Sequence, residues 1–324
     1  MKARLLEWLE KAMEAGAYDL HIKSAFPPVI RIADEIHRMD VPAISPKELE
    51  KLVQEILDPK QKVIFSNHGQ IDCSINFPGK VRVRGNIFFQ RNSLAVSFRL
   101  VSTSVPDLYK IGFPQEVIDT ISKISRGMIL VTGSTNSGKS TTVGSILHYL
   151  ANKDSLHIIT IEDPIEYIFP DYPQSVVSQR QIGDDCKDFN SGLTAALRQD
   201  PDVIMIGELR DQDTVETCLK ASETGHLVLG TLHTSNAIQS ISRLINIFPP
   251  FQRENIRFMI SSSLRIIISQ ILLPSADHKK RVLAYEVLPC LPSVANLIRQ
   301  QKVHEIASVL RLGRRSGCIP MSAS

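Results

Sequence analysis

The chain has 324 residues, which is enough for two domains that each bury a core of their own. Its hydrophobic content of 43%, charged content of 22% and net charge of +3 fit an ordinary globular protein and argue against a broad nucleic-acid-binding surface. No apolar run reaches the roughly 18 residues of a membrane-spanning helix. Five scattered cysteines without a C-x-x-C pair argue against a disulfide framework or a structural zinc site, and the acidic residues near the N-terminus argue against a secretory signal. These features predict a cytoplasmic protein.

The N-terminal segment predicts an amphipathic helix, because Leu5, Leu9 and Met13 recur at helical spacing. Such a helix can pack on a core or lie on a membrane surface, and packing is the favoured interpretation. Residues 19–23 alternate between apolar and polar side chains like a strand, and a second short strand is expected at 29–32.

A second helix is expected after Ser45-Pro46, where Glu48 stands at the reciprocal position of a capping box. Alternating apolar residues on both sides of Pro78-Gly79 then predict a hairpin, and 94–100 predicts another strand. Residues 1–100 therefore predict a smaller N-terminal α+β domain built on an antiparallel sheet. We expect residues 101–112 to form a linker.

Residues 113–324 predict a second domain, in which helices alternate with short apolar strands. This alternation is typical of an α/β fold with a parallel sheet covered by helices. From Pro249 onward the pattern predicts a mostly helical part. The strands are expected at 127–132, 156–161, 203–207 and 227–231.

A phosphate-binding loop follows the first of these strands, since residues 133–140 match G-x-x-x-x-G-K-[ST] between a strand and a helix. In such loops the backbone N–H groups and the helix N-terminus bind the negative charge of a polyphosphate. Lys139 is expected to reach the β- and γ-phosphates, and the Ser140 hydroxyl to ligate Mg²⁺. The residues expected to bind the nucleotide, ATP, are Gly133, Ser134, Thr135, Asn136, Ser137, Gly138, Lys139, Ser140 and Thr141.

Carboxylates at two further strand ends predict hydrolysis. Glu208 ends an apolar strand at the edge where parallel α/β sheets bind ligands, so it can hold Mg²⁺ through water or polarise a water. The alternative is a surface glutamate. Glu162, Asp163 and Glu166 form an acidic turn after the strand at 156–161, and Glu162 and Asp163 are further candidate metal ligands. Carboxylates this close favour a shared cation, although a solvated acidic loop is the alternative.

Two histidines flank the strand at 227–231. His226 and His233 lack the spacing of helical metal ligands, and no further cluster of histidines or cysteines completes a zinc set. We interpret them as polar contacts at the nucleotide site or at a subunit seam, and His233 is included among the nucleotide-binding residues. Either one could instead be an ordinary core histidine.

Four motifs in order resemble the secretion and pilus motor ATPases, and among them the PilT-like retraction ATPases of type IV pili. They are the Walker A loop (133–140), the acidic T-I-E-D-P-I-E box (160–166), the Walker B region ending in G-E-L-R-D (207–211) and the histidine box (223–234). The resemblance covers residues 19–317, and D-L-H-I with P-P-V-I-R-I (19–32) is similar to the small PAS-like domain of that family.

The resemblance implies a RecA-like P-loop core and a homohexameric ATPase with Mg²⁺ as cofactor. It implies that Glu166 activates water, that Glu208 serves Mg²⁺, and that N-terminal arginines reach the phosphates. By position these arginines are Arg84 and Arg99. Both are expected in strands, where a charged side chain suits a phosphate ligand. Arg82 shares a strand face with Arg84 and can replace it, and Arg91 is a further candidate.

The family also implies a role. The expected role is pilus retraction at an inner-membrane platform protein, with the ATPase held at the cytoplasmic face by its partners. The absence of a four-cysteine motif separates the chain from the extension ATPases, whereas residues 293–300 keep only the N-L-I-R centre of the retraction motif. A type II or type IV secretion or conjugation motor is the alternative. A DNA translocase and a regulatory protein with little turnover are further rivals, but no nucleic-acid partner is expected.

Overall fold

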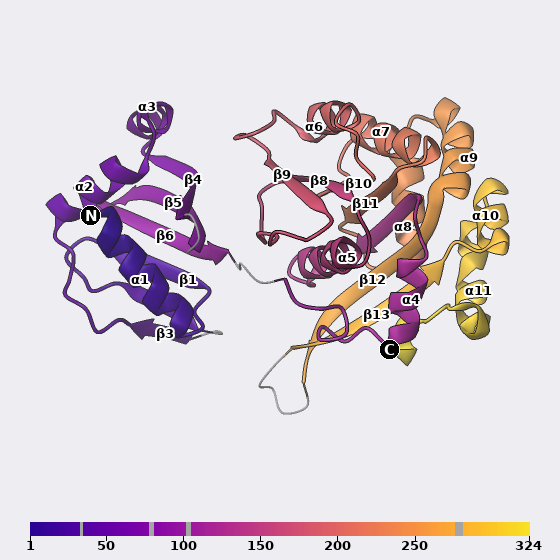
Figure 1. Cartoon of the computed structure of the whole chain (residues 1–324), viewed down its shortest axis with the longest axis horizontal. Helices are drawn as coiled ribbons and strands as arrows, with labels where there is room; N and C mark the ends of the chain where they lie inside the picture. Colours follow the sequence, from indigo (N-terminus) through magenta and orange to yellow (C-terminus); the bar gives the residue numbers. More distant parts are fainter. Residues whose placement is uncertain (33–34, 78–80, 102–104, 276–280) are drawn as a thin grey trace. The chain divides into compact units, whose positions relative to one another are not determined.

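The computed structural model describes residues 1–32, 35–77, 81–101, 105–275 and 281–324. Its contacts divide the chain into two compact units, both drawn in Figure 1. The first unit is Met1–Ser104 with Glu166–Ile168, and the second is Val105–Ile165 with Phe169–Ser324. The turn expected at Pro78-Gly79 lies outside the described residues, as do residues 102–104 of the expected linker.

The first unit is an antiparallel sheet with helices on one face. Within the described ranges its strand order is β3-β2-β1-β6-β5-β4. This confirms the α+β architecture expected for the N-terminal part. The elements are α1 (Lys2–Glu14), β1 (Asp19–Lys23), β2 (Val29–Ile32), β3 (Glu35–Arg38), α2 (Pro46–Ile56), α3 (Pro59–His68), β4 (Gln70–Phe77), β5 (Val81–Gln90) and β6 (Ser93–Val101).

Helix α1 packs on the core of this unit rather than presenting an apolar face to solvent. Leu5 and Leu9 are fully buried, and Trp8 is 2% exposed, whereas Met13 at the end of the helix is partly exposed. Helix α2 begins at the expected capping box, in which Ser45 and Glu48 each accept a hydrogen bond from the other's backbone N–H. Core packing is therefore the correct interpretation of the N-terminal helix.

The second unit is an α/β fold around a mainly parallel sheet. Its helices are α4 (Gln115–Ser122), α5 (Lys139–Lys153), α6 (Phe189–Ala196), α7 (Gln212–Glu223), α8 (Ala237–Asn246), α9 (Arg253–Ser263), α10 (Pro292–Arg299) and α11 (Ile306–Leu312). Its strands are β7 (Gly127–Thr132), β8 (His157–Glu162), β9 (Val176–Gln181), β10 (Val203–Ile206), β11 (Leu227–Leu232), β12 (Leu264–Pro274) and β13 (Arg281–Pro289). Short 3₁₀ turns occupy Pro250–Gln252, Val303–Glu305, Arg314–Ser316 and Met321–Ala323.

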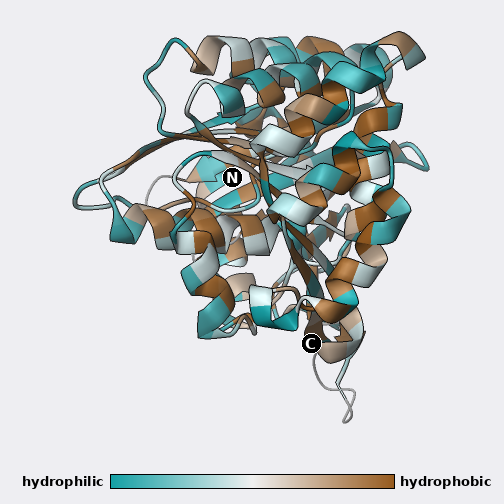
Figure 2. Ribbon diagram, turned by 90° about the vertical axis from the view of Figure 1, so that its right-hand side faces the viewer, coloured by the Kyte–Doolittle hydropathy of each residue, from teal (hydrophilic) through white to brown (hydrophobic). Residues whose placement is uncertain are grey.

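The sheet separates two apolar cores. Its order in the described residues is β13-β12-β7-β11-β10-β8-β9, and β12 and β13 are the antiparallel pair. Along β7, Met128 and Leu130 join one core, whereas Ile129 and Val131 join the other, because successive side chains of a strand point to opposite faces. In Figure 2 the strands are largely brown, whereas the covering helices carry both brown and teal residues. The four predicted strands and the parallel α/β fold are confirmed.

The expectation of a mostly helical part after Pro249 is wrong for residues 264–289. These residues form β12 and β13, which Figure 1 shows as two long neighbouring strands. The segment L-R-I-I-I-S-Q-I-L-L-P is mostly apolar without regular alternation, and periodicity alone cannot distinguish a buried strand of that kind from a buried helix. Its β-branched isoleucines are the signal that favours a strand.

No helix of the described residues is both long and apolar enough to cross a membrane. All five cysteines are free thiols.

Glu286 on β13 is a buried carboxylate whose replacement should stabilise the fold. Its Oε1 accepts a hydrogen bond of 2.9 Å from the Ala237 backbone N–H, and burial raises its pKa. A folded-state pKa above the unfolded value means that stability is complete below the unfolded pKa and falls as pH rises through the folded pKa. Glu286→Gln keeps an acceptor without the charge. We expect it to raise the melting temperature by about 2–4 °C near neutral pH, and the gain should vanish towards about pH 4.

Thermal unfolding at both pH values measures this effect. Glu50→Gln, which removes an exposed carboxylate from the middle of α2, is the matched control and should leave the melting temperature unchanged. An equal gain for Glu286→Gln at both pH values would contradict the assignment of the effect to ionisation.

Candidate active site

Four sequence motifs meet at one edge of the sheet in the second unit. Strands β7, β8, β10 and β11 are parallel neighbours, so their carboxyl ends share one edge. The residues that follow these ends include Gly133, Asp163, Glu208 and His233. Ligands of open parallel α/β sheets bind at this edge.

The phosphate loop lies between β7 and α5, which is the strand–loop–helix context that the sequence predicts. Asn136 adopts the left-handed conformation with φ of 61°, and Gly138, at φ of 88°, precedes the first residue of α5. Ser134, Thr135 and Asn136 are exposed, as is Ser140, whereas Thr141 is half-buried on the first turn of the helix. An exposed loop in front of a helix N-terminus presents its N–H groups to an anion.

Lys139 lies folded against this loop. Its side chain is largely buried, and its Nζ donates hydrogen bonds to the carbonyl oxygens of Gly133 at 2.9 Å and Ser134 at 2.8 Å. The same Nζ lies 3.4 Å from His233 Nδ1. The cation is therefore held at the loop before any phosphate binds, and phosphate oxygens can replace the two carbonyls as acceptors.

Strand β12 packs against the phosphate loop and holds it by a hydrogen bond. Gln270 is buried and its Nε2 donates a hydrogen bond of 2.8 Å to the Ser137 carbonyl oxygen. At Gly133 a Cβ atom would come within 2.4 Å of the Gln270 carbonyl oxygen, so no side chain fits between loop and strand. The strand that sequence reasoning missed thus determines the position of the loop.

Replacement of Gly133 by alanine should therefore disrupt the loop. The new methyl group would meet backbone atoms of β12, which cannot move aside cheaply, and we expect a loss of about 1–3 kcal/mol in unfolding free energy together with weakened nucleotide binding. Gly225→Ala is a matched control, because Gly225 also has a positive φ but no atom lies within 4 Å of a Cβ placed there. Denaturant unfolding and nucleotide titration of both variants measure the difference. Equal losses in the two variants would contradict the steric argument.

A network of charged side chains lies beside the loop. Arg210 Nε donates to Glu208 Oε2 at 2.6 Å, and His233 Nε2 lies 3.4 Å from the same oxygen. Arg210 Nη1 lies 3.9 Å from Asp163 Oδ2. Through His233 the network reaches Lys139. The structure thus brings together Lys139, Glu208, His233 and Asp163, and Arg210, to which the sequence argument gave no role, connects two of the carboxylates.

The three carboxylates of the acidic turn lie in different surroundings. Glu162 is 7% exposed, and its Oε1 accepts hydrogen bonds from Thr160 Oγ1 at 2.7 Å and Gln179 Nε2 at 3.0 Å. Asp163 is more open and faces Arg210. Glu166 is exposed and belongs by its contacts to the first unit. Because Glu162 is buried and accepts two hydrogen bonds, its role is to stabilise the conformation of the turn.

The N-terminal arginines lie on two neighbouring strands of the first unit. Arg84 on β5 pairs in register with Arg99 on β6. Arg99 Nε donates to Asp19 Oδ1 at 2.9 Å, and this hydrogen bond raises the pKa of Arg99. Arg82 shares the face of Arg84, because it lies two residues away on the same strand. Arg91 has a φ of 46° in the turn between the strands.

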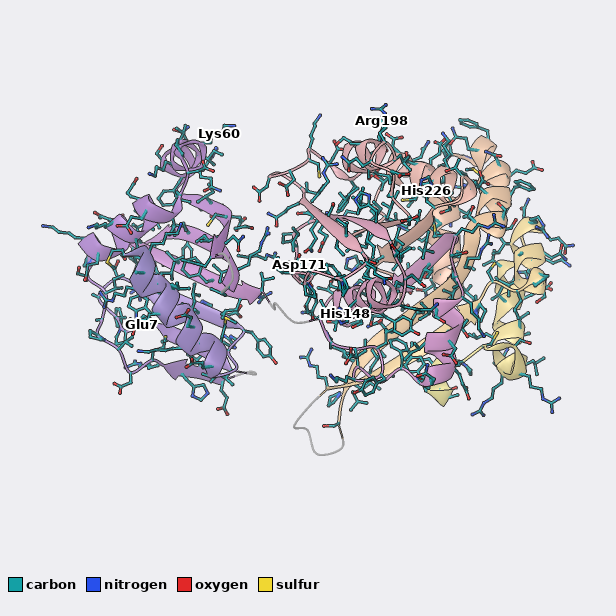
Figure 3. All side chains as sticks on the ribbon, in the orientation of Figure 1. Glu7, Lys60, His148, Asp171, Arg198 and His226 are labelled. Atoms are coloured by element: carbon teal, nitrogen blue, oxygen red, sulfur yellow. The ribbon has the colours of Figure 1, made fainter. Side chains whose placement is uncertain are left out.

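Glu166, Arg84 and Arg99 belong to the first unit. Within the second unit, His226 lies apart from the network around Lys139 and Glu208. His226, labelled in Figure 3, comes just before β11, and its Nδ1 lies 3.1 Å from the carbonyl oxygen of Ala221 near the end of α7. His226 is therefore at the opposite end of β11 from His233.

Two glutamines on β9 hold the loop that carries Glu166. Gln181 Oε1 accepts a hydrogen bond of 3.3 Å from the Ile165 N–H, and Gln179 Oε1 accepts one of 3.1 Å from the Phe169 N–H. Sequence reasoning missed both residues. Their spacing of two along a strand, which places both on one face, is the signal that could have indicated a shared role.

The donor set suits Mg²⁺ bound together with a nucleotide. Within the described ranges no group of three or more histidine, cysteine or acidic side chains could hold a metal by itself. Mg²⁺ is usually bound through one or two protein ligands, waters and substrate phosphates, so such a cluster is not required. The exposed Ser140 hydroxyl suits a direct ligand of Mg²⁺. The Glu208 carboxylate already accepts a hydrogen bond from Arg210, so it suits a contact to the metal through water.

Comparison with known proteins identifies the family of the chain. Residues 3–319 match the family described as type II/IV secretion system protein. The chain is 38% identical to the type IV pilus retractation ATPase PilT of Pseudomonas aeruginosa over 97% of this chain and 90% of that protein. It is 41% identical to the uncharacterized protein YggR of Escherichia coli over 94% of this chain and 92% of that protein.

A solved structure is similar over the same length. The crystal structure of the pilus retraction motor PilT with bound ADP superimposes with a TM-score of 0.88 and 43% identity, covering 98% of this chain and 96% of that one. The family resemblance and the α/β fold expected from the sequence are confirmed. The chain belongs to the type II/IV secretion system protein family, as one of its PilT-like ATPases.

Proposed function

We propose that the chain hydrolyses ATP to power retraction of type IV pili, as a homohexameric ring that acts on an inner-membrane platform protein. The observation that carries the proposal is the contact of the phosphate-loop lysine with the other motifs: Lys139, His233 and Glu208 form one connected network at the sheet edge. Similarity to PilT over nearly the whole chain supports the choice of pilus retraction.

The proposed chemistry assigns each charged group a separate task. Lys139 and the loop N–H groups bind the phosphates, and Glu166 accepts a proton from the attacking water as general base. Arg84 and Arg99 supply positive charge to the phosphates, with Arg82 and Arg91 as alternatives. Ser140 and Glu208 would hold Mg²⁺, which when bound neutralises phosphate charge.

The proposed organisation has two domains, 1–100 and 113–324, joined by a linker at 101–112. ATP binding and hydrolysis would change the position of the N-terminal arginines through their attraction to the γ-phosphate, and this change would produce motion. The ring would lie at the cytoplasmic face of the inner membrane, attached peripherally through its partner and without nucleic acid.

A deletion strain of the organism that encodes the chain tests the function. Loss of twitching motility together with excess surface pili is expected, because pili would extend without being retracted. Restoration by the wild-type gene and not by the Lys139→Ala gene would tie the phenotype to ATP. Normal twitching and piliation in the deletion strain would contradict the proposal.

A motor of a type II or type IV secretion system is the second candidate, because the matching family includes both kinds of system. That candidate predicts a secretion defect with normal twitching in the same deletion strain. The neighbouring genes, whether pilins or secretion components, distinguish the two before any strain is made.

A further inference from the structure

A tyrosine and an aspartate from distant parts of the second unit meet one histidine of helix α5. His148 Nδ1 lies 2.7 Å from the Tyr172 hydroxyl oxygen, and His148 Nε2 lies 3.9 Å from Asp107 Oδ1. The two rings are 5.6 Å apart between centroids and tilted by 55°. Figure 3 labels His148 on α5 and Asp171, the residue before Tyr172, in the neighbouring loop.

Contacts at both ring nitrogens hold the imidazole in one orientation. Asn152 Nδ2 donates to the His148 carbonyl oxygen at 2.9 Å and lies 3.2 Å from His148 Nε2. Because Tyr172 lies at Nδ1 and Asn152 at Nε2, each ring nitrogen has a polar neighbour. Burial raises the pKa of Tyr172 to about 12, so its hydroxyl stays neutral at physiological pH. The His148–Tyr172 contact is thus a hydrogen bond in a half-buried setting.

Asp107, His148 and Tyr172 connect three segments of the second unit. Asp107, which pairs with Lys110 at 2.8 Å, lies in the segment with which the second unit begins. His148 lies on α5, whose first turn carries Lys139 and Ser140. Tyr172 lies in the loop between β8 and β9, which also carries Glu166.

Tyr172 is the third attachment of that loop. The Ile165 and Phe169 N–H groups are already held by Gln181 and Gln179, and Phe169 and Tyr172 both pack against the core that contains α5. Glu166 therefore sits in a short span fixed at both ends, and the hydrogen bond of Tyr172 to His148 fixes the residues just beyond it.

We propose that His148 is a positioning residue that links the start of the second unit to the loop of Glu166. The inference rests on the proposed function, in which Glu166 is the general base. Through Tyr172 the imidazole holds the loop, and through Asp107 it contacts the segment with which the second unit begins. Loss of either contact frees the ring, loosens the loop and lowers turnover.

Steady-state ATP turnover of the full chain measures the first half of the proposal. Tyr172→Phe and His148→Leu should each lower kcat about fivefold, the effect of one hydrogen bond. The dissociation constant for ATP and the melting temperature should stay at wild-type values. His148→Asn offers an amide donor near the position of Nδ1 and should recover most of kcat. Tyr149→Phe, a hydroxyl deletion at the next residue of α5, is the matched control.

Hydrogen exchange of the nucleotide-free protein measures the second half without reference to activity. Backbone amides of residues 165–175 should exchange faster in Tyr172→Phe, in His148→Leu and in Asp107→Asn, and at the wild-type rate in Tyr149→Phe. Unchanged exchange in Tyr172→Phe and Asp107→Asn would overturn the proposal. Equal losses of melting temperature and ATP affinity with unchanged kcat would also overturn it, by showing a merely structural contact. Failure of the proposed role of Glu166 differs from both, since Glu166→Gln would then keep full turnover while the exchange differences remained.

Discussion

Replacement of Lys139 by alanine is expected to lower ATP turnover by about two to three orders of magnitude, the cost of removing one preorganised donor from a charge-stabilising site. The lysine is largely buried, and the backbone carbonyls of Gly133 and Ser134 fix its Nζ at the phosphate loop. It is also the residue through which the loop meets His233 and Glu208. Phosphate release by the purified protein measures the loss.

Lys153→Ala is the matched control for this prediction. Lys153 ends the same helix, and its Nζ donates to the Ser122 carbonyl oxygen, away from the phosphate loop. Full turnover is expected in this variant. Near-wild-type turnover in Lys139→Ala would show that the loop does not bind the reacting phosphates.

Replacement of Glu166 by glutamine should separate binding from chemistry. Loss of a general base costs about 10²- to 10⁴-fold in kcat, whereas an exposed side chain outside the phosphate loop contributes little to nucleotide affinity. The expected result is therefore a large fall in kcat with an unchanged dissociation constant for ATP. Single-turnover kinetics and a fluorescent-nucleotide titration measure the two quantities.

Glu162→Gln is the informative comparison, because Glu162 precedes Glu166 in the same acidic turn but is buried and hydrogen-bonded to Thr160 and Gln179. We expect it to lower the melting temperature as well as kcat, since its loss disturbs the turn itself. Retention of full turnover by Glu166→Gln would move the role of base to another carboxylate.

The parts of the fold that the sequence predicts correctly are those with a local signal. Strand β7 and the phosphate loop follow from a short apolar run and a motif in the right context, and Asn136 adopts the left-handed backbone that its side chain tolerates. The capping box of α2 is encoded within four residues and forms as expected. Such features depend on neighbours in sequence, so they can be read without the tertiary structure.

The parts that could not be predicted depend on contacts across the fold. Gln270 supports the phosphate loop from a strand more than a hundred residues later, and its segment has the mostly apolar pattern shared by buried helices and strands. The contact of His148 with Tyr172 joins residues of a helix and a loop that no motif pairs. Arg210 was visible beside Glu208 in the sequence, but its ion pair with Asp163 requires two strand ends to meet.

Retraction of individual pili is the most direct measurement of the central claim that ATP hydrolysis at this site powers retraction. Pili labelled on living cells of the deletion strain can be followed by fluorescence microscopy after complementation with the wild-type, Lys139→Ala or Lys153→Ala gene. We predict normal retraction with the wild-type and Lys153→Ala genes and extended pili that do not retract with Lys139→Ala. Retraction at the wild-type rate in cells that carry only the Lys139→Ala gene would contradict the account.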